Sequence, residues 1–248
     1  MSTPPSAVPR RTQPRFVFVV TYGRSGSTLT QGMLNTLPRT LVRGENNLYL
    51  LQLFRAYAGL SSFMDKFGGA AAKPSSAFYG LREADLDAFA TSVRELVQQQ
   101  LLGSIDVGEV DRLGFKEVLW HRIKPKEWSG FFDFTDAAFE QPLYVLNRRD
   151  VSMTSTSGFW RKKRPGVAER QINRVRSLQD FLRESRPDRC FDTEFEAMTS
   201  TDREVAEGQL RGLAEFVTGG CDEDLLAALI ATREIGHGPN PFGKARDA

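Results

Sequence analysis

The stretch TYGRSGSTLTQGML, residues 21–34, directly follows the run FVFVV at residues 16–20. That run is short and rich in β-branched and aromatic residues, which is typical of a buried strand. Apolar residues then recur at helical spacing from Leu29 to Leu37. The sequence therefore predicts a strand, a loop of small residues and a helix in direct succession.

The loop at residues 21–28 has the composition of an anion-binding site. Backbone N–H groups at the start of a helix point toward a ligand there, and the helix dipole favours negative charge. Arg24 adds a cation, while Gly23 and Gly26 permit a positive φ and close approach of a ligand. Hydroxyl donors are supplied by Ser25, Ser27 and Thr28. These features suit a tetrahedral anion with several oxygens.

Of two other interpretations of this loop, the first fails its test and the second stays open. The ATP-binding loop G-x-x-x-x-G-K-[ST] needs a lysine after its second glycine, and Ser27 stands at that place. A purely structural alternative is a tight strand-to-helix turn that is capped by a serine. The choice between an anion-binding loop and this structural turn depends on the rest of the chain.

Length and composition set the class of protein. The chain has 248 residues, of which 40% are hydrophobic, enough for one sizeable core or at most two small ones. The net charge of +2 predicts no strong attraction to nucleic acid or membrane surfaces. No apolar stretch approaches the roughly 20 residues of a membrane helix. Two cysteines predict neither a disulfide framework nor a metal site, so a reducing cytoplasm is the expected compartment.

The order of the predicted elements indicates the fold. Residues 1–15 are Pro-rich and polar and predict a disordered arm without a secretory signal, followed by one domain over residues 16–248. An irregular insertion is predicted over residues 59–80. Strands are predicted at 16–21, 40–43, 112–118, 142–148 and 190–195, and helices at 27–37, from about 46, at 83–102, 126–139, after 150, and at 166–185, 202–217 and 222–233.

Such alternation predicts an α/β fold with a central, mostly parallel sheet and helices on both faces. In sheets of this kind, ligands bind beyond the carboxyl ends of the strands. One rim should therefore carry four groups of residues, namely the 21–28 loop, Glu45, Lys116–His121 and Arg148–Ser157.

The stretch YVLNRRDVSMTSTSGFW, residues 144–160, is the second informative segment. A strand delivers Arg149 to its end, Asp150 is placed to cap the next helix, and Ser157 follows about two turns later. An arginine and a serine in this arrangement can hold a second phosphate. The alternative is a helix cap with an ordinary salt bridge.

Taken together, the two segments resemble the motifs of sulfotransferases that use 3′-phosphoadenosine-5′-phosphosulfate (PAPS). In that family a loop [RK]-[ST]-G-[ST]-[ST]-[LFW] binds the 5′-phosphosulfate, and R-[DN]-P-x-x-x-x-x-S binds the 3′-phosphate. The second motif matches at Arg149, Asp150 and Ser157, with Val151 in place of proline and Arg148 as an alternative register. The first motif reads Arg24-Ser25-Gly26-Ser27-Thr28-Leu29.

The resemblance implies a three-layer fold similar to P-loop proteins and transfer of a sulfuryl group from PAPS, usually without a metal, leaving PAP. It is closer to the bacterial and carbohydrate-type enzymes, which implies a small-molecule or carbohydrate hydroxyl as acceptor. In several such members a glutamate in the position of Glu45 is the proposed general base. His121 is the rival base, and Lys116 either contacts the sulfonate or acceptor or only pairs with Glu45 or Glu117.

Two further functions remain as alternatives to this resemblance. A P-loop kinase-like phosphotransferase would need the missing lysine and a carboxylate that binds Mg²⁺ at a strand end. A non-catalytic protein that binds PAP or PAPS would keep the nucleotide motifs without a working acceptor site. The sequence does not predict the oligomeric state.

Overall fold

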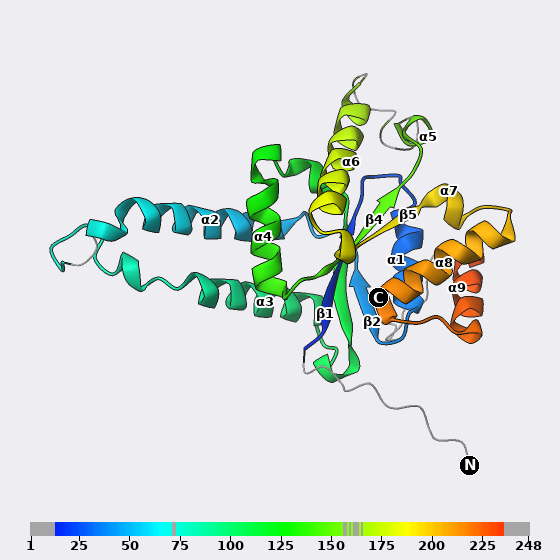
Figure 1. Cartoon of the computed structure of the whole chain (residues 1–248), viewed down its shortest axis with the longest axis horizontal. Helices are drawn as coiled ribbons and strands as arrows, with labels where there is room; N and C mark the ends of the chain where they lie inside the picture. Colours follow the sequence, from blue (N-terminus) through cyan, green and yellow to red (C-terminus); the bar gives the residue numbers. More distant parts are fainter. Residues whose placement is uncertain are drawn as a thin grey trace, which may run out of the picture.

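A computed structural model describes residues 13–70, 73–155, 158, 160, 164 and 166–235 of the chain. Its centre is a sheet of five strands in the order β2-β3-β1-β4-β5, in which all four neighbouring pairs are parallel (Figure 1). The α/β class predicted from the alternation is therefore confirmed. The strands are β1 (Arg15–Val20), β2 (Thr40–Arg43), β3 (Arg112–Glu117), β4 (Leu143–Arg148) and β5 (Cys190–Glu194).

Helices cover both faces of the sheet and make it the middle of three layers. The helices are α1 (Ser27–Thr36), α2 (Tyr49–Phe67), α3 (Leu86–Leu102), α4 (Trp128–Phe139), α5 (Val151–Ser155), α6 (Val167–Ser185), α7 (Phe195–Met198), α8 (Arg203–Thr218) and α9 (Glu223–Ile235). Short 3₁₀ turns lie at Gly68–Ala70, Leu81–Glu83, Val107–Glu109, Leu119–Arg122, Pro125–Glu127 and Pro187–Arg189. None of the helices among the described residues combines the length and apolar character needed to cross a membrane.

The alternation of side chains along β1 explains the three layers. Phe16, Phe18 and Val20 point into a core shared with α2, α3, α4 and α6. Val17 and Val19 point to the opposite face, into a core shared with α1, α8 and α9. A parallel strand that is buried on both faces reads as a continuous apolar run, which is why FVFVV stands out in the sequence.

The segment predicted as an irregular insertion, residues 59–80, begins as a helix. Helix α2 continues to Phe67, so the prediction was wrong for residues 59–67. The ring centroids of Phe63 and Phe67 lie 4.7 Å apart, and Phe67 stacks on Phe78 with 4.3 Å between centroids. These aromatic contacts stabilise the end of the helix, whereas the small residues around them resemble a loop in sequence.

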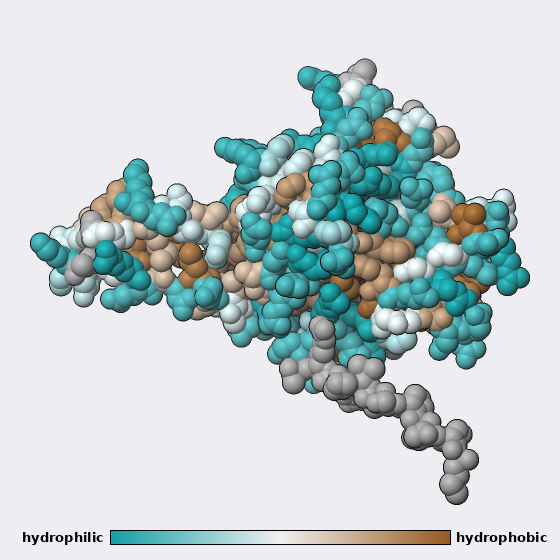
Figure 2. Space-filling view, in the orientation of Figure 1, coloured by the Kyte–Doolittle hydropathy of each residue, from teal (hydrophilic) through white to brown (hydrophobic). Residues whose placement is uncertain are grey.

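Helices α2 and α3 form an arm that projects from the body of the molecule (Figure 1). Hydrophobic residues are visible on the surface of this arm between hydrophilic ones (Figure 2). Phe63, Tyr79 and Leu96 are among its exposed apolar side chains. At the N-terminal side, β1 begins at Arg15, and residues 1–12 of the predicted arm lie outside the described residues.

Candidate active site

The loops that follow β1, β2, β3 and β4 meet at one edge of the sheet, because parallel strands all end there. In the register of the sheet, Val20 lies opposite both Glu117 of β3 and Leu146 of β4. The 21–26 loop therefore emerges between the ends of β3 and β4. This is the rim on which the sequence analysis placed the site residues.

The 21–26 loop holds two residues in the left-handed region of backbone conformation. Gly26 has a φ of 78°, as expected for a glycine, but the second such residue is Arg24, with a φ of 67°, and not Gly23. A left-handed conformation at an arginine costs about 1–2 kcal/mol, so surrounding contacts must hold it. The Trp160 indole donates to the Gly23 carbonyl at 2.8 Å. A Cβ at Gly158 would lie only 2.8 Å from Arg24 Nε, so this backbone packs closely on the arginine.

Helix α1 begins at Ser27 without a capping side chain. Its N-cap residue is Gly26, which offers no side-chain acceptor, so the serine-capped turn is not observed. The Leu29 N–H bonds to the Gly26 carbonyl at 2.9 Å, whereas the N–H groups of the first turn before it have no intrahelical acceptor. Thr28 is exposed beside them. An uncapped helix start of this kind is suited to an anion.

The absence of a side chain at Gly26 makes room for an aromatic ring. A Cβ at Gly26 would fall 2.0 Å from the Phe195 ring at the start of α7. The Arg149 guanidinium lies 4.3 Å from the centroid of the same ring. Phe195 thus joins the loop to the end of β4, a role that the sequence analysis did not predict. The close contact seen at Gly26 is with this ring, and the approach of a ligand there stays a prediction.

A buried amide, Asn147, fixes the loop from behind. Its Nδ2 donates to the Ser25 carbonyl and the Ser25 hydroxyl, both at 3.0 Å, and to Thr21 Oγ1 at 3.1 Å. Its Oδ1 accepts hydrogen bonds from Thr30 Oγ1 at 2.5 Å and Thr193 Oγ1 at 3.2 Å. All five residues are buried. The Ser25 hydroxyl is therefore turned into the core, contrary to its predicted role as a donor to the anion.

Arg149 lies beside the loop, and Arg148 points elsewhere. Arg149 Nη1 donates to the Arg24 carbonyl at 3.2 Å, and its Nε is buried without a hydrogen-bond partner among the described residues. Arg148 instead pairs with Asp180 at 2.6 Å. This geometry favours the register that runs from Arg149. Ser157, its predicted partner, lies outside the described residues.

Two neighbours set the backbone around Arg149. The Tyr22 hydroxyl donates to the Arg149 carbonyl at 2.6 Å and accepts from the Arg149 N–H at 2.8 Å. Burial raises the pKa of the Tyr22 phenol, so it stays a neutral donor. Asp150 accepts the Met153 N–H at 3.0 Å and caps α5 as predicted. The hydrogen bond from Ser152 and that cap lower the pKa of the Asp150 carboxyl.

Glu45 and Lys116 form an ion pair on the other side of the loop. Lys116 Nζ donates to Glu45 Oε1 at 2.7 Å. The Lys116 side chain is buried, whereas 49% of the Glu45 side chain is exposed. A carboxylate held by a buried ammonium group and open to solvent is placed to meet a ligand from the outside.

The Glu117 carboxylate organises the loop that carries Glu45. Its Oε2 accepts the N–H groups of Asn46 at 3.1 Å and Leu48 at 2.8 Å, and its Oε1 accepts those of Val118 at 2.7 Å and Leu119 at 3.0 Å. The side chain is fully buried. These four bonds fix the ends of β2 and β3 against each other. Sequence alone offered no signal that Glu117 is turned inward.

His121, the second candidate base, lies in the turn Leu119–Arg122 and is half-buried. Burial lowers the pKa of its imidazole, and the nearby charges of Arg122 and Arg174 add to that effect. The neighbouring Trp120 is fully buried and donates from its indole to the Val19 carbonyl at 3.1 Å. No hydrogen bond among the described residues joins His121 to the Glu45–Lys116 pair.

A cavity of about 570 Å³ opens next to Glu45. The loop after β2 forms one wall, the start of α2 another, and the C-terminal half of α3 the third. Among the polar groups at the cavity, Tyr49 Oη and Asn46 Nδ2 are buried without a hydrogen-bond partner in the described part of the chain. The lining residues are Arg43, Gly44, Glu45, Asn46, Tyr49, Leu96, Gln100 and Leu101.

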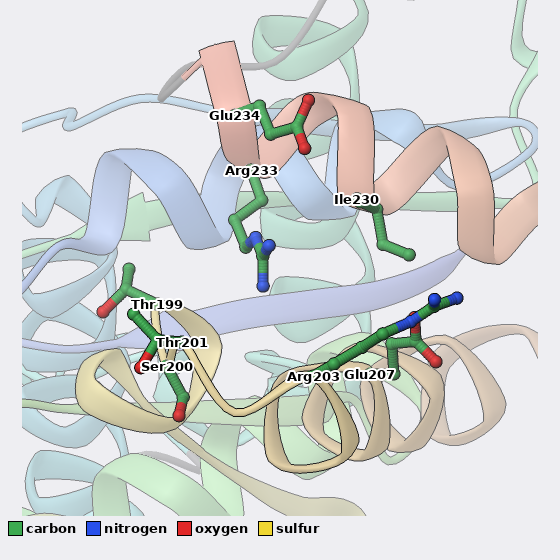
Figure 3. A pocket seen from close by; sticks show the side chains of 8 residues that line it. All are labelled: Thr199, Ser200, Thr201, Arg203, Glu207, Ile230, Arg233 and Glu234. Carbon is green, nitrogen blue, oxygen red and sulfur yellow. The ribbon is translucent and has the colours of Figure 1, made fainter.

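A second cavity, of about 540 Å³, lies between the turn after α7 and the helices α8 and α9. Figure 3 shows Arg233 pointing from α9 toward the turn with Thr199, Ser200 and Thr201. Arg203 pairs with Glu207, and the second arginine is adjacent in sequence to Glu234. None of the predicted site residues lines this cavity.

Comparisons with known proteins complete these observations. No family model matches the chain, and no curated protein matches it either. Among solved structures, the chain is similar to the sulfotransferase domain from the Synechococcus PCC 7002 olefin synthase. The identity is 19%, the TM-score is 0.49, and the match covers 89% of this chain and 79% of that one. A similarity of this size does not show the chemistry of this chain.

Proposed function

We propose that the protein is a sulfotransferase that moves a sulfuryl group from PAPS to a hydroxyl group. The observation that carries this proposal is the arrangement along one rim of the sheet. An uncapped helix start with Arg24 stands between Arg149 on one side and the Lys116–Glu45 pair on the other. Two anion sites and one carboxylate match a doubly phosphorylated donor and an acceptor that must lose a proton.

The donor would be held at two places. The first-turn N–H groups of α1, the Thr28 hydroxyl and Arg24 suit the 5′-phosphosulfate, since they combine backbone donors with a positive charge. Arg149 suits the 3′-phosphate, since its Nε has no hydrogen-bond partner among the described residues and lies 3.9 Å from the Glu196 carboxylate. Ser157 is the further donor that the motif implies for this phosphate. Anchoring both phosphates orients the sulfur for in-line attack.

The transfer needs one proton acceptor and produces PAP. The acceptor oxygen forms a bond to sulfur while the bond between sulfur and the 5′-phosphate oxygen breaks, and the electron pair of that bond leaves with PAP. Glu45 takes the acceptor proton as general base. Lys116 holds Glu45 in place and supplies a positive charge near the sulfonate oxygens. Arg24 and the N–H groups of α1 stabilise the charge that grows on the leaving phosphate.

A transfer assay tests this function directly. The protein would be incubated with PAPS carrying radioactive sulfur and a panel of hydroxyl compounds, with EDTA present, and sulfated products would be separated from the donor. Transfer that is lost in Arg149→Ala and Glu45→Gln supports the proposal. Transfer of phosphate from ATP with Mg²⁺, in place of sulfate from PAPS, would support the kinase alternative instead. PAP binding without transfer to any acceptor would support the non-catalytic alternative.

A further inference from the structure

The cavity beside Glu45 is mainly apolar on its α3 side, which is unusual for a site that would bind a sugar. On the α3 side it is lined by Leu96, Gln100 and Leu101, and the start of α2 adds the Tyr49 ring. Leu96 is 41% exposed, so its side chain is accessible to a ligand in the cavity. The volume of about 570 Å³ falls within the range of roughly 300–1,000 Å³ that is usual for small-molecule sites.

Two polar groups at the cavity are left without partners. Tyr49 Oη and Asn46 Nδ2 are buried, and neither has a hydrogen-bond partner among the described residues. A buried donor that is not satisfied is costly, so such groups mark a place where a ligand or water supplies the bond. Burial also raises the pKa of the Tyr49 phenol to about 12, so the hydroxyl stays protonated and able to donate.

Glu45 connects this cavity with the reaction. Its carboxylate lines the cavity and at the same time bonds to the buried Lys116 at the end of β3. A hydroxyl group bound in the cavity would therefore lie beside Glu45. The position beyond it, toward the end of β3 and the 21–26 loop, is where the donor's sulfonate would lie.

We propose, on the basis of the proposed function, that this cavity is the acceptor site and that the acceptor is an alcohol with a mainly apolar body. The alcohol hydroxyl bonds to Glu45, and its carbon skeleton packs on Tyr49, Leu96 and Leu101.

Polar side chains at this cavity lie mainly on the wall of the loop after β2, with Arg43, Glu45 and Asn46, and the α3 side offers a sugar few partners. Every hydroxyl of a monosaccharide needs a partner once it leaves water, and each one left unpaired costs about 1–3 kcal/mol. The α3 wall offers Gln100 as its one polar side chain, between Leu96 and Leu101. The chemistry of the walls therefore narrows the acceptor from the broad class of alkyl hydroxyls to those on an apolar skeleton.

The reaction at this site is balanced by groups already named. The alcohol oxygen bonds to sulfur, its proton passes to the Glu45 carboxylate, and the sulfur–oxygen bond to the 5′-phosphate breaks to release PAP. The products are an alkyl sulfate ester and PAP, and no oxidant or reductant is needed.

The test uses a series of primary alcohols from butanol to octanol, with glucose and N-acetylglucosamine as the sugar arm. With PAPS as donor, kcat/KM should rise roughly twofold to fourfold for each added methylene, the range expected for burying one CH₂ group in a partly open cavity. The sugars should give values at least tenfold below that of octanol. A flat dependence on chain length, or sugars as the better acceptors, would overturn the acceptor class while leaving the sulfotransferase function intact.

Substitutions inside and outside the cavity show whether an effect on the KM for octanol comes from the cavity. Leu96→Asp should raise the KM for octanol at least tenfold, because the substitution lies on the cavity wall. PAP affinity should stay within twofold, because the exchanged side chain is exposed. Val205→Asp is the matched control, since Val205 on α8 is 47% exposed and lies outside the cavity, and its KM should not change. Tyr49 Oη has no hydrogen-bond partner among the described residues, so a change in KM in Tyr49→Phe reports on the acceptor.

A binding measurement that needs no transfer reaction distinguishes failure of the proposed function from failure of the cavity assignment. Octanol would be titrated calorimetrically into the wild type and the Leu96→Asp variant, each with and without PAP. If PAP does not bind and PAPS gives no transfer, the proposed function fails; octanol binding that Leu96→Asp abolishes would still support an apolar-alcohol site. No octanol binding, or binding that Leu96→Asp leaves unchanged, would refute the cavity assignment.

Discussion

Asn147→Ala tests whether the buried amide network sets the shape of the 21–26 loop. The substitution removes Nδ2, which holds the Ser25 carbonyl and hydroxyl and Thr21 Oγ1, and Oδ1, which accepts from Thr30 and Thr193. The Ser25 carbonyl and one or both threonine hydroxyls then stay buried and unpaired, at about 1–3 kcal/mol each. With partial relaxation, we expect the free energy of unfolding to fall by about 2–5 kcal/mol.

The assay combines urea denaturation with calorimetric titration of PAP. Because the loop backbone is fixed through Ser25, PAP affinity should fall at least fivefold in the variant that remains folded. Asn35→Ala is the matched control, since Asn35 bridges α1 to the backbone of Val42 through two similar hydrogen bonds away from the loop. It should lose stability but keep PAP affinity. A stability loss below about 0.5 kcal/mol for Asn147→Ala would refute the network's energetic role, and unchanged PAP affinity would refute its role in shaping the site.

Three further predictions concern the charged groups of the rim. Arg149→Ala should weaken PAP binding roughly 10- to 150-fold in calorimetry, because a charged hydrogen bond is worth about 1.5–3 kcal/mol; an unchanged affinity in a folded variant would place the 3′-phosphate elsewhere. Glu45→Gln should lower kcat about 10²- to 10⁴-fold and keep PAP affinity within a few-fold, whereas His121→Gln should lower kcat far less. The reverse result would make His121 the base. Burial lowers the pKa of His121 below its ordinary value of 6.5, so protonation favours the unfolded state. Stability should therefore fall as the pH drops from about 6.5 to the folded pKa, and urea denaturation of His121→Gln should show a shallower fall over that window.

The framework of the fold was predictable from the sequence because the local patterns agree with the burial of each element in the tertiary structure. The run at residues 16–20 is apolar throughout because β1 is buried on both faces, and β2 matches the predicted range 40–43. The start of α2 was predicted near residue 46 but lies at Tyr49. Asn47 and Leu48 both have a positive φ, and the N–H groups of Asn46 and Leu48 bond to the Glu117 carboxylate, a contact that no local pattern reveals.

The sequence predicted the site residues whose position depends on their own loop. It missed those that hold the site through contacts with segments distant in sequence. Asp150 caps α5 as its spacing predicted, whereas the role of Arg24 at an anion stays a prediction. Asn147, Glu117 and Phe195 were missed because each takes its role from strands and loops that are distant in sequence. A polar residue inside an apolar strand, such as Asn147 in LYVLNR, is the one signal that would have pointed to the network.

The central claim, that the rim binds a doubly phosphorylated adenosine nucleotide as the product of sulfuryl transfer, is tested most directly by calorimetry with PAP, 5′-AMP and ATP in EDTA. The account predicts that PAP binds roughly 10- to 150-fold more tightly than 5′-AMP, because only PAP carries the 3′-phosphate that Arg149 would hold. It also predicts that Mg²⁺ leaves PAP affinity unchanged. Equal affinities for PAP and 5′-AMP, or tight binding of ATP that requires Mg²⁺, would contradict the account.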